Sequence, residues 1–225
     1  MSTDLISKSD LEEKVGKIEE ETDTTMSVAI TDGDEMRAVG HIGQFPAWST
    51  IKVPIALAAV EECSYDDAYR DELITASIEW SDNDAAYYLW TCLGDPETAD
   101  ARTEEMISRG GTSLHMEPAF GLTRWSIPSQ AQFGHYISSL DEGNPVIEAM
   151  HNIDEEQSYG LGTLDDAAFK GGWSDDEDGS WHTRQFGFFN HDGETYGVAI
   201  AARSESGSYA DGQEALTAIT EFLIQ

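Results

Sequence analysis

Residues 45–62 read FPAWSTIKVPIALAAVEE, an almost wholly apolar stretch that contains a serine and a lysine three positions apart. Apolar residues would cover nearly every side of a helix here, which is typical of a buried helix. Ser49 and Lys52 would then lie on the same side, about one turn apart. Burial disfavours a charged amine and lowers its pKa, so Lys52 is suited to accept a serine proton. A capping serine followed by a lysine whose amine reaches solvent gives the same pattern, so this motif alone leaves both interpretations open.

Two further short motifs follow in the chain. S-D-N at 81–83 directly precedes a helical pattern, and these residue types also serve as ordinary helix N-caps. K-G-G at 170–172 falls within a predicted strand, where glycine permits a ligand to approach the backbone. Each motif is common by itself. The order S-x-x-K, S-D-N, K-x-G is the signature of serine β-lactamases and penicillin-binding proteins, and its three parts together are far more specific than any one of them.

With these motifs the chain resembles the penicillin-recognising serine enzymes, and among them the class A β-lactamases. FPAWSTIKVPIAL resembles the segment around the nucleophile of that class, and the stretch from ITASIEWSDN to RGGTSL resembles its following helices. The pattern GLGTL…FKGGW…RQFG…AIAAR is also similar to that of actinobacterial β-lactamase-like proteins. The resemblance covers residues 45–115 and 160–225. It implies an α/β (α+β) fold, in which an antiparallel sheet flanked by the terminal helices is joined to an inserted all-helical lobe.

The periodicity of the whole chain favours the same architecture. Residues 1–48 and 151–225 most simply build one sheet with flanking helices, and residues from about 49 to 150 an inserted helical lobe. We therefore expect a single β-lactamase-like domain over residues 1–225. The expected helices are 4–21, 49–62, 66–77, 83–93, 96–109, 128–140 and 210–224, and the expected strands are 24–33, 35–43, 167–173, 182–193 and 195–203.

Residue by residue, the resemblance implies a set of catalytic roles. Ser49 is expected to be the nucleophile that becomes acylated, and Lys52 to take its proton. Ser81 is expected to pass a proton to the leaving group, and Asn83 to orient the substrate and the lysine. Lys170 is expected to set the electrostatics of that proton transfer.

The strand that carries the K-G-G motif is expected to bind the substrate. The resemblance places one N–H of the oxyanion hole at Ser49 and the second near Trp173, with Gly172 beside it. The family usually has threonine or serine where Gly171 stands, and that hydroxyl binds the substrate carboxylate. Arg184, on the next predicted strand, is the candidate for a replacement anion contact, with an ordinary surface arginine as the alternative.

Glu117 is the candidate base for hydrolysis of an acyl-enzyme. Class A enzymes carry Glu-Pro-x-x-Asn in the loop after the helices; Glu117 and Pro118 match its beginning, but Gly121 replaces the asparagine. The loop is also shorter than in the family. A glutamate before a proline arises easily by chance in an acidic chain, so an acyl-enzyme that persists is the other expectation.

The charge of the chain restricts its partners. Lysine and arginine total 12 against 44 aspartate and glutamate residues, a formal net charge of −32 over 225 residues. Such a surface repels phosphate backbones and anionic membranes, so we expect no nucleic-acid partner. A strongly solvated surface explains the charge; adaptation to high salt and a polycationic partner are the alternatives. No apolar run has the length of a membrane-spanning helix, and the N-terminal region lacks the apolar core of a signal peptide.

The motifs and the resemblance together predict a serine hydrolase or acyltransferase that acts through an acyl-enzyme on an amide or ester, either a β-lactam or a cell-wall peptide. The alternative is a catalytically idle protein that binds a peptide or cell-wall component in the same cleft. We expect no cofactor and no metal, because the histidines and cysteines lack ligand spacing. We expect a monomer with a small-molecule or peptide substrate. The expected location is the cell envelope or the exterior, with a leader already removed, and the cytoplasm is the alternative.

Two cysteines lie beyond the first two motifs. Cys63 follows Ser49 by 14 residues, and Cys92 follows Ser81 by 11. At helical rise these separations are about 21 and 17 Å. In the fold that the resemblance implies, the two helices start at the same cleft and pack together, so a disulfide is geometrically feasible. Two unpaired buried thiols are the alternative. A bridge would indicate an oxidising compartment.

Overall fold

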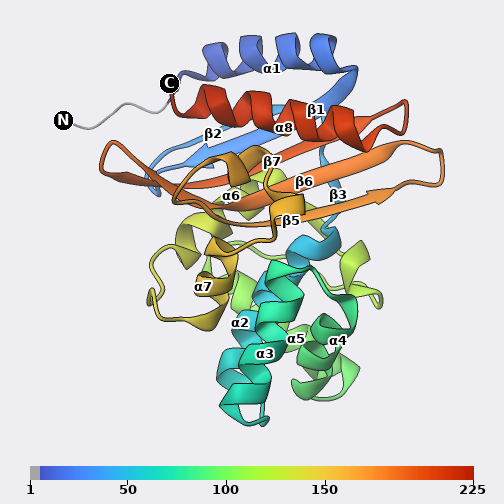
Figure 1. Cartoon of the computed structure of the whole chain (residues 1–225), viewed down its shortest axis with the longest axis vertical. Helices are drawn as coiled ribbons and strands as arrows, with labels where there is room; N and C mark the ends of the chain where they lie inside the picture. The colour runs from blue at the N-terminus through green and yellow to red at the C-terminus, as the bar shows by residue number, and fades with distance from the viewer. Residues whose placement is uncertain (1–5) are drawn as a thin grey trace.

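The computed structural model describes residues 6–225 and arranges them as one antiparallel sheet with helices on both faces (Figure 1). The five strands follow the order β2-β1-β7-β6-β5. Their bounds are Thr24–Thr31 for β1, Met36–Gly40 for β2, Ala168–Asp175 for β5, Trp181–His191 for β6 and Glu194–Ser204 for β7. Because β1 pairs with β7, segments from the two ends of the chain meet in the middle of the sheet. The predicted sheet from the two terminal thirds is confirmed.

A tight turn between β6 and β7 and the pairing of β1 with both of its neighbours set the register of the sheet. The turn between β6 and β7 has Asp192 at φ 51° and Gly193 at φ 86°, the conformation that a two-residue hairpin turn requires. Val28 of β1 lies opposite Val39 of β2 on one side and Ile200 of β7 on the other. Most residues of β1, β6 and β7 are buried, because helices cover both faces of the sheet.

The terminal helices cover one face of the sheet. α1 (Lys8–Thr22) and α8 (Tyr209–Leu223) lie side by side on it (Figure 1). Each begins at a serine cap: the Ser7 and Ser208 hydroxyl oxygens accept the backbone N–H of Asp10 and Asp211. Their apolar sides and this face of the sheet form one of two cores, which includes Leu11, Val15, Ile18, Val28, Ile200, Leu216 and Ile219.

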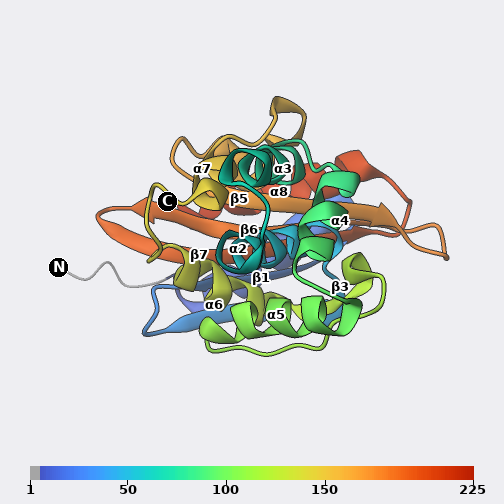
Figure 2. The same ribbon diagram turned by 90° about the horizontal axis from the view of Figure 1, so that it is seen from below.

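The opposite face joins the helical lobe. α6 (Ile127–Ile137) packs on the sheet at close range: a Cβ on Gly134 would stand 2.2 Å from the carbonyl oxygen of Gly187 in β6. Below it, α2 (Lys52–Glu62) is the central helix and is buried from Lys52 to Ala59. It is surrounded by α3 (Asp67–Glu79), α4 (Asn83–Cys92), α5 (Pro96–Arg109) and α7 (Pro145–His151) (Figures 1 and 2).

The structure differs from the predicted elements in a few places. α7 is not among the predicted helices, because seven residues are too few to show a clear helical period. β4 (Arg124–Ser126) lies inside the segment predicted to be all-helical and pairs with β3 (Gln44–Pro46). Ser49 belongs to a 3₁₀ turn, η1 (Trp48–Ile51), and the α-helix begins only at Lys52. The first two positions of the helix predicted over 4–21 lie outside the described residues.

A disulfide joins the far ends of two lobe helices. Cys63 follows the last residue of α2 and Cys92 ends α4; their Cα atoms lie 5.3 Å apart. The structure therefore has the bridge and not the two free thiols. Since α2 begins at Lys52 and α4 at Asn83, the bridge links the ends of these helices that are remote from the two motif residues.

Candidate active site

Ser49 lies where the sheet edge meets the helical lobe. The preceding residue, Trp48, has φ 49°, a left-handed conformation that is rare for a bulky side chain and is found where the surroundings enforce it. One such constraint is β5: a Cβ on Gly172 would stand 2.9 Å from the backbone nitrogen of Ser49. The backbones of the K-G-G strand and the nucleophile turn thus approach closely, although Gly172 follows Ser49 by 123 positions in the chain.

Lys52 points from the start of α2 to the S-D-N motif. Its Nζ donates to the carbonyl oxygen of Ser81 at 2.6 Å and to Oδ1 of Asn83 at 2.7 Å, and lies 3.3 Å from Oγ of Ser81. Within residues 6–225 the Ser49 hydroxyl makes no hydrogen bond to another residue, so the contact that the three-residue spacing made feasible is not formed. The two strong acceptors of the S-D-N motif hold the amine instead.

Burial lowers the pKa of both motif lysines. The side chain of Lys52 is only 2% exposed, and loss of solvation lowers its pKa to about 8, although the nearby charge of Asp82 acts to raise it. Lys170 on β5 has no exposed surface. Loss of solvation, and then repulsion by Lys52, hold the pKa of Lys170 well below its ordinary value. Neutral amines are therefore accessible at this site near physiological pH.

Ser81 is the point where the two lysines meet. Its Oγ lies 3.1 Å from Nζ of Lys170 as well as 3.3 Å from Nζ of Lys52. Ser81 itself has φ 59°, which turns the chain sharply between α3 and α4. A hydroxyl can accept a hydrogen bond from one amine and donate to the lone pair of another, so this arrangement can relay a proton.

Gln157 completes the surroundings of Lys170. It ends the 3₁₀ turn η3 (Glu155–Gln157), where its amide nitrogen donates to the carbonyl of Glu79 at 2.9 Å, and its Oε1 accepts from Lys170 at 3.4 Å. Lys170 also donates to the carbonyl of Gly171. Sequence reasoning missed Gln157, because it lies in no motif and no periodic segment marks it.

Gly172 and Trp173 are placed beside the nucleophile by the register of the sheet edge. β5 is an edge strand whose only neighbour in the sheet is β6, where Arg184 lies opposite Gly172 and Thr183 opposite Trp173. Every second backbone N–H of an antiparallel edge strand faces away from its partner, which makes such groups available to a ligand. The half-buried Trp173 ring stacks on Tyr209 of α8, with centroids 5.9 Å apart.

Arg184 does not occupy the position expected of an anion-binding residue. It has no exposed surface, and its guanidinium donates to the carbonyl oxygens of Phe45, Pro46 and Trp125 and to Oε1 of Gln130. Burial lowers its pKa to about 9. The side chain fastens β3 and β4 to the sheet, so it is neither a substrate contact nor the surface arginine considered as the alternative. The period-two strand pattern could not reveal this, because both faces of β6 are covered.

Glu117 and Gly121 lie on a loop that borders the nucleophile turn. Gly121, in η2 (Phe120–Leu122), faces Trp48: a Cβ on it would stand 3.8 Å from the Trp48 carbonyl oxygen. Glu117 is exposed, and its backbone N–H donates to Oγ1 of Thr123 at 3.0 Å. Among the described residues, its carboxylate makes no hydrogen bond to either motif lysine or to Ser49. The loop thus borders the nucleophile turn, but no hydrogen bond among the described residues directs the Glu117 carboxylate toward Ser49.

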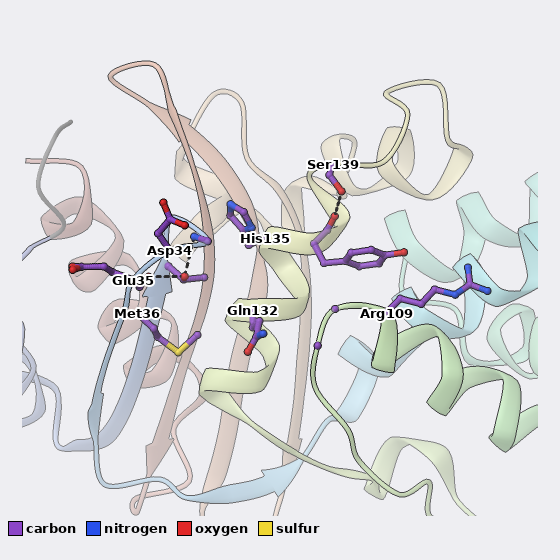
Figure 3. A pocket seen from close by; sticks show the side chains of 12 residues that line it. Asp34, Glu35, Met36, Arg109, Gln132, His135 and Ser139 are labelled. Carbon is purple, nitrogen blue, oxygen red and sulfur yellow. Dashed lines mark hydrogen bonds between the residues drawn. The ribbon is translucent and has the colours of Figure 1, made fainter. Parts of the chain in front are cut away.

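A cavity elsewhere in the molecule does not include these residues. It measures about 580 Å³ and lies between the β1–β2 turn, the end of α5 and α6, where His135, Gln132 and Arg109 line it (Figure 3). Across residues 6–225 no cluster of three histidine, cysteine, aspartate or glutamate side chains is arranged to hold a metal ion. No helix in that range has the length and apolar character needed to cross a membrane.

Comparisons with known proteins support the fold. No family model and no curated protein sequence matches the chain. Among solved structures, a class A β-lactamase from Bacteroides cellulosilyticus is 15% identical at a TM-score of 0.75, covering 95% of this chain and 97% of its own. A β-lactamase from Chitinophaga pinensis is 18% identical at a TM-score of 0.75, with 94% and 97% covered. The extended-spectrum β-lactamase TLA-3 is 15% identical at a TM-score of 0.75, with 97% and 100% covered. The chain therefore has the fold of class A β-lactamases over almost its whole length, as its motifs predicted.

Proposed function

We propose that this protein is a serine hydrolase or acyltransferase that forms an acyl-enzyme at Ser49 with an amide or ester substrate. The observation that carries the proposal is the convergence of Lys52, at the start of the helix that follows Ser49, and Lys170 of β5 on the Ser81 hydroxyl, at 3.3 and 3.1 Å. Two buried amines are costly to fold, and perturbed titratable groups of this kind cluster at sites that move protons.

The proposed reaction begins with attack of Ser49 Oγ on the substrate carbonyl carbon, while neutral Lys52 takes the serine proton. A C–O bond forms and the carbonyl oxygen becomes an oxyanion, for which the backbone N–H groups of Ser49 and Trp173 are the proposed donors. The bond to the leaving nitrogen or oxygen then breaks. The proton on Lys52 passes through the Ser81 hydroxyl to that leaving atom, with Lys170 neutral or charged beside it.

The fate of the acyl group depends on a second nucleophile, either water or an acceptor amine. Glu117 is the candidate base for water, but it is exposed and no hydrogen bond among the described residues directs it toward Ser49. We therefore propose slow deacylation, with β-lactams or cell-wall peptides as the substrate classes considered. Among residues 6–225 no hydrogen bond joins the Ser49 hydroxyl to Lys52, which favours the second candidate: an idle protein that binds a peptide or wall component at this site.

Covalent labelling distinguishes the two candidates. The protein is incubated with a fluorophosphonate and with a labelled penicillin, and the modified peptide is identified by mass spectrometry. We expect label on Ser49, and none in Ser49→Ala, whose thermal unfolding should match that of the unchanged protein. Unlabelled Ser49 with both reagents, together with saturable binding of a wall peptide, would support the idle binding protein instead.

We also propose an oxidising compartment, the cell envelope or the exterior, as the site of action. The Cys63–Cys92 bridge supports it, since such bridges persist mainly outside reducing cytosol. The substrate is proposed to be a small molecule or peptide that is bound by a monomer.

A further inference from the structure

We infer that the cleft at Ser49 selects neutral or cationic acyl donors and discriminates against donors that carry a carboxylate. The inference rests on the proposed function, and it specifies the substrate class of that site. Three features carry it: the lysines and arginines near Ser49 are buried or hydrogen-bonded within the fold, acidic side chains are exposed on the two segments that carry Asn83 and Gly172, and Gly171 gives β5 no hydroxyl.

The lysines and arginines near Ser49 are mostly buried and hydrogen-bonded within the fold, so few of their donors can reach a substrate anion. Lys52 and Lys170 are 2% and 0% exposed, and both are hydrogen-bonded to the S-D-N motif. Arg184, opposite Gly172 in the sheet, is fully buried and donates to three backbone carbonyls. Arg124 on β4 is exposed, but it donates to the carbonyl of Gln44.

Acidic residues, by contrast, are exposed on the segment around Asn83 and on the segment that follows Gly172. Asp82 and Asp84 flank Asn83, the residue that holds Lys52, and the charge of Asp82 acts on that amine. On the other side, the strand that touches Ser49 runs directly into Asp175, Asp176 and Glu177, all exposed. Asp175 lies three residues beyond Gly172, or about 10 Å along an extended strand. Exposed charges of one sign near a site favour ligands that are neutral or of the opposite sign.

At Gly171, β5 lacks a side chain that could donate a hydrogen bond to an anion. A Cβ at this position would meet its nearest neighbours, Cζ3 of Trp173 and the carbonyl oxygen of Arg184, at 3.7 and 3.8 Å, which is ordinary contact. A hydroxyl-bearing side chain would therefore fit. Glycine at 171 is thus not imposed by packing, unlike glycine at 172.

Three matched acyl donors test the inference. They are 4-nitrophenyl esters whose acyl chains end in a carboxylate, a methyl ester or an ammonium group, and the second-order rate constant of acylation is measured from the nitrophenol burst. At low ionic strength we expect the carboxylate to react about tenfold more slowly than the methyl ester, and the ammonium donor to react at least as fast. The difference should shrink as salt is added.

Charge variants locate the cause. Asp82→Asn combined with Asp84→Asn should bring the carboxylate and methyl ester rates several-fold closer, while the asparagine at 82 can keep the helix cap. Glu221→Gln, on α8 at the other face of the sheet, removes a charge far from Ser49 and should leave the ratio unchanged. Gly171→Thr should raise the rate of the carboxylate donor relative to the methyl ester.

The outcomes separate this inference from the proposed function. Acylation of Ser49 in which the carboxylate donor reacts as fast as the methyl ester, or faster, overturns the inference and leaves the proposed function standing. Equal effects of the aspartate pair and Glu221→Gln also overturn it, since the flanking acids would then have no special influence. Absence of any acylation of Ser49 by all three donors overturns both.

Discussion

Lys52 and Lys170 hold the same hydroxyl: their Nζ atoms lie 3.3 and 3.1 Å from Oγ of Ser81. Two ammonium groups this close and this buried repel one another, so charging one lowers the pKa of the other. A positive charge on one amine therefore favours the neutral form of the other, which can accept a proton. The lowered pKa values of these two amines should appear in the pH dependence of Ser49 acylation.

Acylation of Ser49 should become faster as the pH rises through about 8, the value to which burial lowers the pKa of Lys52. The direction follows from the proposed role, because only the neutral amine can take the serine proton. Below the pKa of Lys52 the rate should fall about tenfold for each pH unit, and above it the rate should level off. The acylation rate of a neutral probe between pH 5 and 10 provides the measurement.

Lys52→Ala is the matched variant for this profile. It should lower acylation by roughly 10²- to 10⁴-fold and remove the rising limb near pH 8. A pH profile that keeps the same limb in Lys52→Ala would show that another group, with Lys170 the first candidate, is the base.

Removal of the Cys63–Cys92 bridge should destabilise the helical lobe. The bridge closes a separation of 29 residues, for which chain entropy alone predicts a loss of about 3–4 kcal/mol in the free energy of unfolding. The double variant Cys63→Ser and Cys92→Ser should unfold at lower denaturant concentration than the oxidised protein. Acylation at low temperature should persist, because the bridge joins the helix ends remote from Lys52 and Asn83.

Titration of thiols provides the control for the bridge. The oxidised protein, denatured without reductant, should show no thiol that reacts with Ellman's reagent. Two reactive thiols would show that the bridge is absent. A double variant that is as stable as the oxidised protein would show that the bridge does not stabilise the lobe.

Added salt should stabilise the fold, because the chain carries a formal net charge of −32. Between about 0.1 and 1 M salt the screening length falls from about 10 to about 3 Å, which weakens repulsion among exposed carboxylates. If self-repulsion costs about 2 kcal/mol, Tm should rise by roughly 4–8 °C. Calorimetry in potassium chloride measures this effect, whereas sulfate would stabilise any protein through its exclusion from the surface. A Tm that is flat or falls with chloride would contradict the expectation.

The sequence predicted the sheet and most helices because their patterns are long and periodic. Its three motifs contain Lys52, Ser81, Asn83 and Lys170, which the structure brings together. The apolar run after Ser49 showed that α2 is buried, and Asp192-Gly193 marked a hairpin turn that the structure contains. Such features depend on neighbours in the chain, which is the information that a pattern holds.

What the sequence did not predict depends on contacts between distant segments. Gln157 reaches Lys170 only because η3 folds back against the end of α3, where Glu79 fixes it. The burial of Arg184 follows from its hydrogen bonds to β3 and β4. The three residues of β4 are too few to show a period in the sequence. The pairing of Cys63 with Cys92 was left open for the same reason, since two helices must pack before the distance is defined.

Adjacent glycines on β5 give the sharpest test of how the strand and the nucleophile turn fit together. A Cβ on Gly172 would stand 2.9 Å from the backbone nitrogen of Ser49 and 3.0 Å from the carbonyl oxygen of Ala47, so both sides of the contact are backbone and cannot rotate away. A Cβ on Gly171 meets nothing closer than 3.7 Å.

Gly172→Ala should therefore push β5 away from Ser49, displace the proposed oxyanion donors and lower acylation by roughly 10²-fold or more. Gly171→Ala adds the same methyl group one residue away and should retain acylation of a neutral probe within about threefold, a difference of less than about 1 kcal/mol. Burst kinetics with both variants, after circular dichroism has shown that they are folded, decides the matter: equal losses in the two would mean that the close approach of Gly172 to Ser49 has no part in the reaction.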